Sequence, residues 1–283
     1  DYFDKNALFN TDRPIDVTFT SSTRVTIDGS DYAEPWCGTA TSNGGTRCRY
    51  DYVSERAIQP DSKAVGATLN HTYRLGDDRE FFAEAMLQQN TGSAYDSAAA
   101  FDVRVPGNAA FVPQWARDID AEDGEVDQIR IRSRFRERRI QDYDSQSYRL
   151  LAGLRGELGD WSWETAATYG KTDNEITHVS GYMGIDKVAD ALADGSFNPF
   201  NLGRDNSESV IAGLREIAPR IGESDVYSVD FNFSGTLFED ISAVFGGEFR
   251  GEEISDNPAE VAQSGGIFAL GASDAAADRT QYA

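Results

Sequence analysis

Paired segments in which apolar and polar residues alternate over about 11 positions constrain the fold of this chain more than any other feature. In the first pair, Val65, Leu69 and Tyr73 share one face and polar residues share the other. The pattern recurs in hairpins at 64–89, 147–170 and 226–251, with short turns near positions 77, 160 and 239. A period of two is typical of β-strands with one apolar face. The chain is therefore predicted to be all-β and antiparallel.

Strand length indicates a membrane protein. Strands of about 11 residues exceed the mode of about six in soluble sheets and match the roughly 9 to 11 residues that cross a bilayer obliquely. Long polar loops at 14–63, 90–146, 171–225 and 252–281 alternate with the short turns, and Tyr148, Trp161, Trp163 and Tyr169 lie near strand ends. We expect residues 1–283 to form part of one transmembrane β-barrel domain with long extracellular loops. A soluble antiparallel sandwich, whose core would take the same aromatics, is the alternative.

The segment at 128–136 also alternates, but counting it as a full crossing would break the reversal of direction that each crossing requires. We therefore place this segment above the membrane, as a β excursion that is either a loop hairpin or a strand extension, and the role of the wider region 127–140 stays open. Its arginines are expected to be solvated or to line the lumen, and a nucleic-acid patch is disfavoured in so acidic a chain.

Composition argues against several function classes. The 26 Lys and Arg residues against 48 Asp and Glu give a net charge of −22, which would repel nucleic acid. Two His and two Cys residues leave little material for a metal site. The sequence has no nucleophile elbow, phosphate-binding loop or zinc-type His motif. We expect no enzyme activity, no cofactor and no bound metal.

Cys37 and Cys48 lie in a polar stretch without a second Cys pair. A disulfide between them is favoured over two free thiols. The disulfide would stabilise the folded state by roughly 3 kcal/mol and would imply an oxidising compartment.

Two loops contain further local patterns. Residues 185–192 have helical spacing before Gly195, and residues 210–217 have it after the possible caps Ser207 and Ser209. These helices either form a vestibule over a barrel mouth or pack the loop against itself, and the second is favoured. The acidic run at 118–127 is similar to a calcium loop, but Gly124 falls one place late and Glu122 occupies position five. A solvated acidic loop is favoured there.

Several motifs resemble those of TonB-dependent outer-membrane receptors of proteobacteria. The resemblance covers most of the chain and is carried by YRLLAGLRGELGDWSWE at 148–164, DYFD at 1–4 with Leu8 and Asp12-Arg13, FNPF at 197–200, and FSGTL at 233–237 leading to GGEFR at 246–250. It implies about 6 to 8 strands of a probable barrel of about 22 strands in the bacterial cell outer membrane. Such a receptor takes up a scarce nutrient, a metal chelate, vitamin or oligosaccharide, with energy delivered by TonB.

The chain departs from the complete pattern. It shows neither the plug domain, through which TonB would act, nor a terminal strand that ends in an aromatic residue, and residues 278–283 look like the start of a further strand. The partners implied are TonB, a small nutrient and outer-membrane lipid. The alternatives are a soluble secreted β-sandwich that binds carbohydrate or calcium, and a surface barrel without transport.

Polar residues on the strands would face the lumen and contact substrate or plug. The candidates are Glu84, Arg149, Arg155, Glu164, Asp230 and Arg250. For any single one of them, solvation of the wall or pairing with another is the favoured role.

Overall fold

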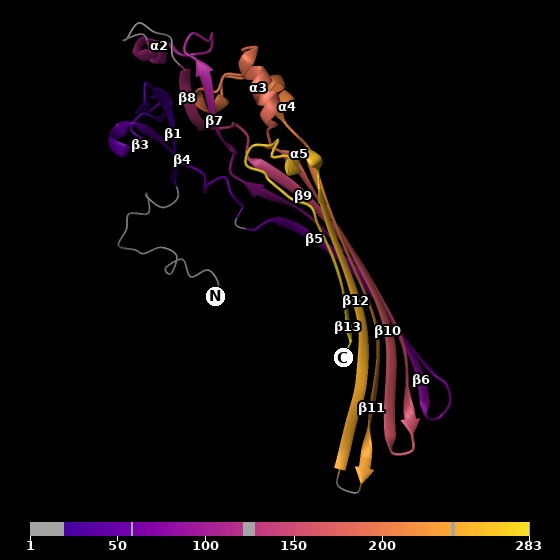
Figure 1. Ribbon diagram of the computed structural model, residues 1–283. Helices are drawn as coiled ribbons and strands as arrows, with labels where there is room; N and C mark the ends of the chain where they lie inside the picture. Colours follow the sequence, from indigo (N-terminus) through magenta and orange to yellow (C-terminus); the bar gives the residue numbers. More distant parts are fainter. Residues whose placement is uncertain (1–19, 58, 121–127, 239–240, 283) are drawn as a thin grey trace.

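The computed structural model describes residues 20–57, 59–120, 128–238 and 241–282, which form two antiparallel sheets and several short helices (Figure 1). The prediction of an all-β, antiparallel fold is confirmed. Neither sheet closes on itself into a barrel within these ranges.

The larger sheet has seven long strands in the order β13-β12-β11-β10-β9-β6-β5. Its members are β5 (Asp61–Arg74), β6 (Arg79–Asp96), β9 (Arg139–Leu158), β10 (Trp161–Ser180), β11 (Ala218–Phe238), β12 (Ile241–Pro258) and β13 (Ala275–Tyr282). The three hairpins of the sequence pattern lie inside β5–β6, β9–β10 and β11–β12, and the strands continue into segments expected to be loops. The further strand expected near the end of the chain is β13, which pairs with β12.

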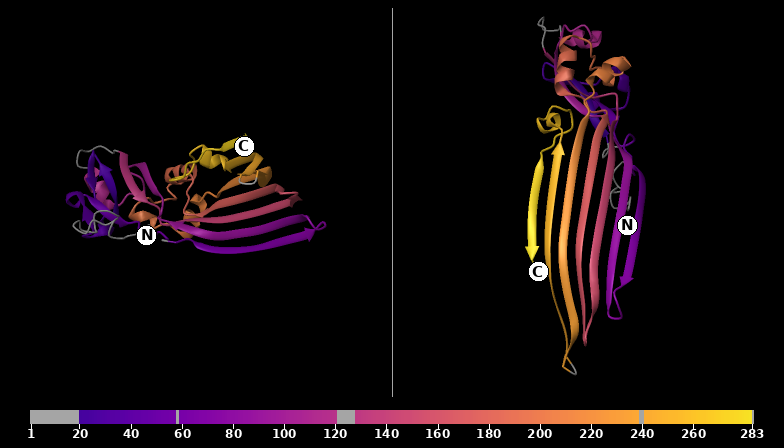
Figure 2. Two further views of the ribbon diagram at one scale, coloured as in Figure 1. Left: turned by 90° about the horizontal axis from the view of Figure 1, so that it is seen from below. Right: turned by 90° about the vertical axis from the view of Figure 1, so that its right-hand side faces the viewer.

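The smaller sheet lies at the end of the long strands that is opposite the short turns (Figure 2). Its order is β3-β4-β1-β8-β7, and β2 also pairs with β1. These strands are β1 (Thr20–Ile27), β2 (Ser30–Tyr32), β3 (Thr41–Ser42), β4 (Arg47–Asp51), β7 (Ala100–Pro106) and β8 (Gln128–Arg134). The alternating segment at 128–136 is thus an excursion from the long sheet, as the direction argument predicted.

Within the described residues, four α-helices accompany the smaller sheet: α2 (Gln114–Asp120), α3 (Ile185–Ala193), α4 (Glu208–Leu214) and α5 (Glu260–Gln263). The helix predicted at 185–192 is confirmed as α3. The helix predicted at 210–217 is confirmed as α4 only up to Leu214, because Arg215 is extended and Ile217 lies beyond the helix. Gly195 follows α3 with a φ of 77°, which glycine adopts without strain. Ser207 caps α4, because its hydroxyl accepts a hydrogen bond from the Val210 backbone N–H at 3.3 Å. We call the smaller sheet together with these helices the end module.

The end module has its own hydrophobic core. Phe101, Phe135 and Phe197 are buried in it, with ring centroids 4.7 to 6.3 Å apart. Val188 of α3 and Ile211 of α4 belong to the same cluster, so both helices pack onto the folded module. The helices therefore follow the favoured expectation, in which the connections pack against themselves.

The disulfide between Cys37 and Cys48 is confirmed. It joins the 3-10 helix η2 (Pro35–Cys37) to strand β4, with a Cα–Cα distance of 5.5 Å. Both residues are buried beneath the edge of the smaller sheet.

Candidate functional site: a sheet with two chemically different faces

One face of the long sheet presents apolar side chains from strand to strand at the same height. The register aligns Leu69, Ala85, Leu150, Tyr169 and Tyr227 in a single row. These side chains are open to the surroundings, and Leu69 and Leu150 are 68% and 52% exposed. We call the band the apolar belt; its large members are Leu69, Tyr73, Phe81, Leu87, Tyr148, Leu150, Leu154, Leu158, Trp161, Trp163, Tyr169, Tyr227, Val229, Phe231, Phe233, Phe245 and Phe249.

The height of the apolar belt matches the hydrocarbon band of a bilayer. On β9 it extends from Tyr148 to Leu158, which is 11 residues. At a rise of about 3.3 Å per residue this is about 33 Å of strand, and a tilt of about 45° reduces it to about 23 Å across the membrane. Outer-membrane barrels carry an apolar band about 25 Å tall.

Aromatic rings border the belt on both sides. Near the short turns, the Trp161 and Phe245 ring centroids are 5.6 Å apart. At the other border, the Tyr148 and Tyr169 centroids are 5.9 Å apart, and the Tyr169 hydroxyl donates to the Asp225 carboxylate at 2.6 Å. Tyrosine and tryptophan favour such borders because one end of the ring system is apolar and the other polar.

Beyond the tyrosine border the same face becomes charged. The row that contains Tyr148 continues through Lys171, Asp225 and Glu253. The Lys171 ammonium lies 3.1 Å from the Asp173 carboxylate and 3.6 Å from that of Glu223. The change from apolar to ionic therefore occurs at one height on β10, β11 and β12.

All six candidate site residues lie on the opposite, polar face of the sheet, as their alternation with the apolar residues predicted. The register places Glu164 opposite Arg155 and Asp230 opposite Glu248. The Glu84–Arg149 pair joins β6 to β9, with 3.5 Å between the carboxylate oxygen and the guanidinium nitrogen. Their role as substrate contacts remains a prediction.

Ion pairs on the polar face connect neighbouring strands and, for Arg250 and Glu252, two residues of the same strand. Arg155 Nε donates to the Glu80 carboxylate at 2.7 Å. Glu252 accepts from Arg250 Nε at 2.7 Å and from Arg279 Nε at 2.6 Å. The sequence pattern missed Glu80, Glu252 and Arg279 because the alternation gives the face of a residue but not its neighbour on the next strand. Among the six candidates, Glu84 and Arg149 pair with each other, whereas Arg155 pairs with Glu80 and Arg250 with Glu252, which were not candidates.

A hollow of about 510 Å³ lies by the short turns of the sheet. Its polar lining includes Arg155 and Glu164, together with Arg74, Glu80 and Ser234. The volume suits a small ligand or a few side chains of another segment. This hollow brings two of the six candidates together at one place, while Asp230 and Arg250 lie outside its lining.

Two buried or partly buried carboxylates fix the end module. Burial raises the pKa of Glu34, which accepts hydrogen bonds from the Asn201 backbone N–H at 2.8 Å and from Trp36 Nε1 at 3.1 Å. Hydrogen bonding to the Arg215 guanidinium lowers the pKa of Glu137, with 2.8 Å between Arg215 Nε and the carboxylate. These contacts link segments far apart in sequence, so the end module is held as one unit.

The described part of the chain contains no cluster of three or more His, Cys, Asp or Glu side chains arranged to hold a metal ion. In the acidic run at 118–127, for which calcium binding was the less favoured interpretation, residues 121–127 lie outside the described residues. None of the helices in the described ranges is long and apolar enough to cross a membrane.

Comparisons of the chain with protein-family models, with curated proteins and with solved structures gave no significant match.

Proposed function

We propose that this chain forms part of the wall of an outer-membrane β-barrel, and that the barrel is a TonB-dependent receptor for a scarce nutrient. The observation that carries the proposal is the apolar belt, which lies on one face of the long sheet at the same height as ion pairs on the other face. Lipid would cover the belt, and the ion pairs would line the aqueous interior.

Exposure of the belt to water would be costly. Burying apolar surface contributes about 25 cal/mol per Å², and soluble monomers rarely expose patches larger than a few hundred Å². Within the described residues the second sheet lies at one end of the long strands and does not cover the belt (Figure 1). This arrangement favours a membrane wall over the soluble sandwich, whose two sheets would cover each other face to face.

Both edges of the long sheet are unpaired within the described ranges. β5 pairs only with β6, and β13 only with β12. In a bilayer each open backbone group costs several kcal/mol, so a sheet that crosses the membrane must close. Further strands on both edges would complete the barrel, for which the family resemblance suggests about 22 strands.

The receptor assignment rests on the resemblance of the sequence motifs and on the end module. The module would stand outside the membrane, where it could contact a metal chelate, vitamin or oligosaccharide before uptake. Glu84, Arg149, Arg155, Glu164, Asp230 and Arg250 would face the passage or a plug that transmits the action of TonB.

Cell fractionation and detergent dependence test the membrane part of the proposal. The full-length protein, expressed from its own gene, should sediment with outer membranes and require detergent to remain monodisperse. A protein that stays folded and monodisperse in plain buffer would exclude the barrel.

Uptake measurements test the transport part. Cells that lack this gene and cells that lack TonB should show the same loss of uptake for one labelled compound in a panel of ferric chelates, cobalamin and oligosaccharides. If the protein is in the outer membrane but neither deletion changes any uptake, the barrel is a passive surface structure.

A further inference from the structure

The outer face of the small sheet gathers arginines in an otherwise acidic chain. Arg24 on β1 lies directly opposite Arg132 on β8, and Arg130 on β8 lies opposite Arg104 on β7. The other face of the same strands carries the buried residues Val25 and Ile131. The arginines therefore lie on the outer face of strands whose inner face packs against the hydrophobic core.

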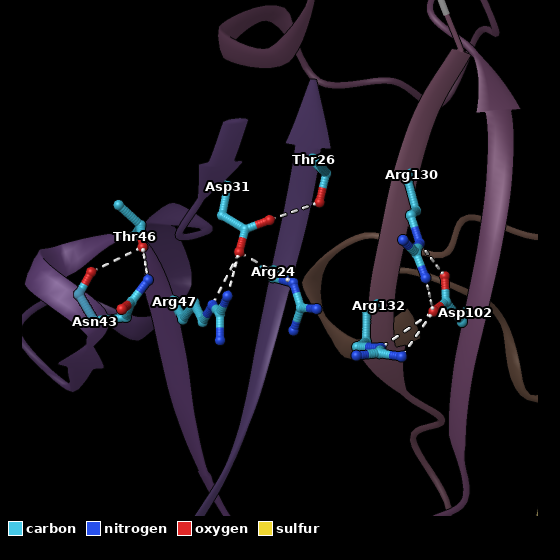
Figure 3. A network of polar contacts seen from close by, with 9 residues as sticks. All are labelled: Arg24, Thr26, Asp31, Asn43, Thr46, Arg47, Asp102, Arg130 and Arg132. Atoms are coloured by element: carbon cyan, nitrogen blue, oxygen red, sulfur yellow. Dashed lines mark hydrogen bonds and ion pairs between the residues drawn. The ribbon is translucent and has the colours of Figure 1, made fainter. Parts of the chain in front are cut away.

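Two carboxylates each lie between two of these guanidiniums (Figure 3). Asp102 accepts from Arg130 Nε at 2.7 Å and from Arg132 Nε at 3.1 Å. Asp31 lies 3.2 Å from Arg24 Nε and accepts from Arg47 Nε at 2.9 Å. Each group of two arginines and one aspartate has a net charge of +1.

Arg24 and Arg132 bring the two positive groups next to each other. Like charges directly opposite in an antiparallel pair are destabilising. Burial lowers the pKa of Arg24, and the charges of Arg47, Arg132 and Arg130 lower it further against the attraction of Asp31. An anion between Arg24 and Arg132 would relieve this repulsion.

A cavity of about 560 Å³ lies beside this pair of arginines. The register between β1 and β8 stops at Arg24 and Arg132, and the two strands spread apart beyond them (Figure 3). Arg24, Arg132, Thr23, Ser133 and Phe268 contribute to the lining. Small-molecule sites commonly have volumes of about 300 to 1,000 Å³.

We propose that this cavity binds a small oxyanion that carries several carboxylate or phosphate groups. Arg24 and Arg132 donate to its charged oxygens, since the planar guanidinium matches both groups. The proposal does not depend on the membrane assignment, because the site lies within the end module.

Calorimetric titration of the purified full-length protein with citrate and, separately, with inorganic phosphate tests the proposal. Saturable binding of at least one anion is expected, with affinity falling as salt rises and with no binding of uncharged glycerol. Arg24→Gln and Arg132→Gln should each weaken binding about tenfold or more, because a charge-assisted hydrogen bond is lost. Arg220→Gln, which removes a partly exposed arginine paired with Asp256 on the long sheet, is the matched control and should bind like wild type.

The melting temperatures of Arg24→Gln and Arg132→Gln, measured without ligand, separate ligand binding from structural effects. The proposal is overturned if wild type binds neither citrate nor phosphate, if the two arginine variants bind like wild type, or if Arg220→Gln loses as much affinity as they do.

Discussion

Neighbouring residues on β9 belong to different environments. Leu154 lies in the apolar belt, and Arg155 lies on the polar face, where it pairs with Glu80. The difference follows from the pleat, which points successive side chains to opposite faces. Single substitutions on β9 should therefore have effects that depend on whether the position is odd or even.

Leu154→Lys is expected to destabilise the protein in a bilayer by about 2 to 4 kcal/mol, the cost of a lysine on the lipid face near the midplane. Leu151→Lys on the polar face is the matched control, since its lysine would lie opposite Glu84. Denaturant unfolding of the full-length protein in lipid vesicles measures both variants. Equal stability of the two variants would show that the face of Leu154 does not contact lipid.

The Glu137–Arg215 pair should make the stability of the end module depend on pH. Because hydrogen bonding to Arg215 holds the pKa of Glu137 below its usual value of 4.5, the pair stabilises the folded state above that pH. This contribution is lost as pH falls below 4.5 through the folded pKa. Glu137→Gln should cost about 1 to 3 kcal/mol at pH 7 and progressively less toward pH 3.

Unfolding curves of wild type and Glu137→Gln between pH 3 and pH 7 give that difference. Glu216→Gln, which removes the carboxylate paired with Lys187 nearby, is a control for loss of an exposed charge, and a smaller effect is expected. A constant difference between wild type and Glu137→Gln across the pH range would mean that the ion pair is not its source.

At the residue scale, the sequence predicted the face of a side chain but not its partner. Glu84 and Arg149 were both assigned correctly to the polar face from local alternation. Their pairing depends on the register between β6 and β9, which are separated by more than 40 residues of chain. Alternation is a local signal, whereas register is set by the whole sheet.

At the scale of elements, the strands are longer than their alternating segments. The hairpin expected at 147–170 lies within β9 and β10, which begin at Arg139 and end at Ser180. Residues 139–146 and 171–180 have polar side chains on both faces, so the apolar alternation stops while the backbone hydrogen bonds continue. The sequence pattern marks where lipid would end, and the strand itself extends further.

The smaller sheet was not predicted as a unit, for a related reason. Its strands are short and come from distant parts of the chain, with Val25 of β1 opposite Ile131 of β8. The alternation in β8 predicted a strand, but its partners β1 and β7 lie in segments that were predicted to be loops. Non-local pairing of short strands leaves little trace in a single sequence.

Removal of the disulfide should weaken the end module but leave the long sheet intact. Replacing both Cys37 and Cys48 with alanine is expected to destabilise the module by about 3 kcal/mol on the chain-entropy account. Amide hydrogen exchange should show faster exchange in β1 and β4 and unchanged protection in β9 and β10. Rapid alkylation of both thiols in unreduced wild-type protein would contradict the disulfide itself.

At the scale of the whole molecule, three features share one axis: the short turns, the apolar belt and the end module. The belt has the height of a hydrocarbon core. The end module lies at the end of the long strands opposite the short turns (Figure 2). A membrane would therefore hold the molecule by the belt and leave the end module, with its arginine cavity, in water.

The most direct test of lipid contact is a scan of spin labels along β9. Single cysteines at positions 149 to 154, in protein whose native cysteines are held in the disulfide, would each carry a label in lipid vesicles. Labels at 150, 152 and 154 should collide readily with oxygen, which concentrates in lipid, and poorly with a water-soluble nickel complex. Labels at 149, 151 and 153 should show the reverse. The account is contradicted if all six labels are equally accessible to the nickel complex.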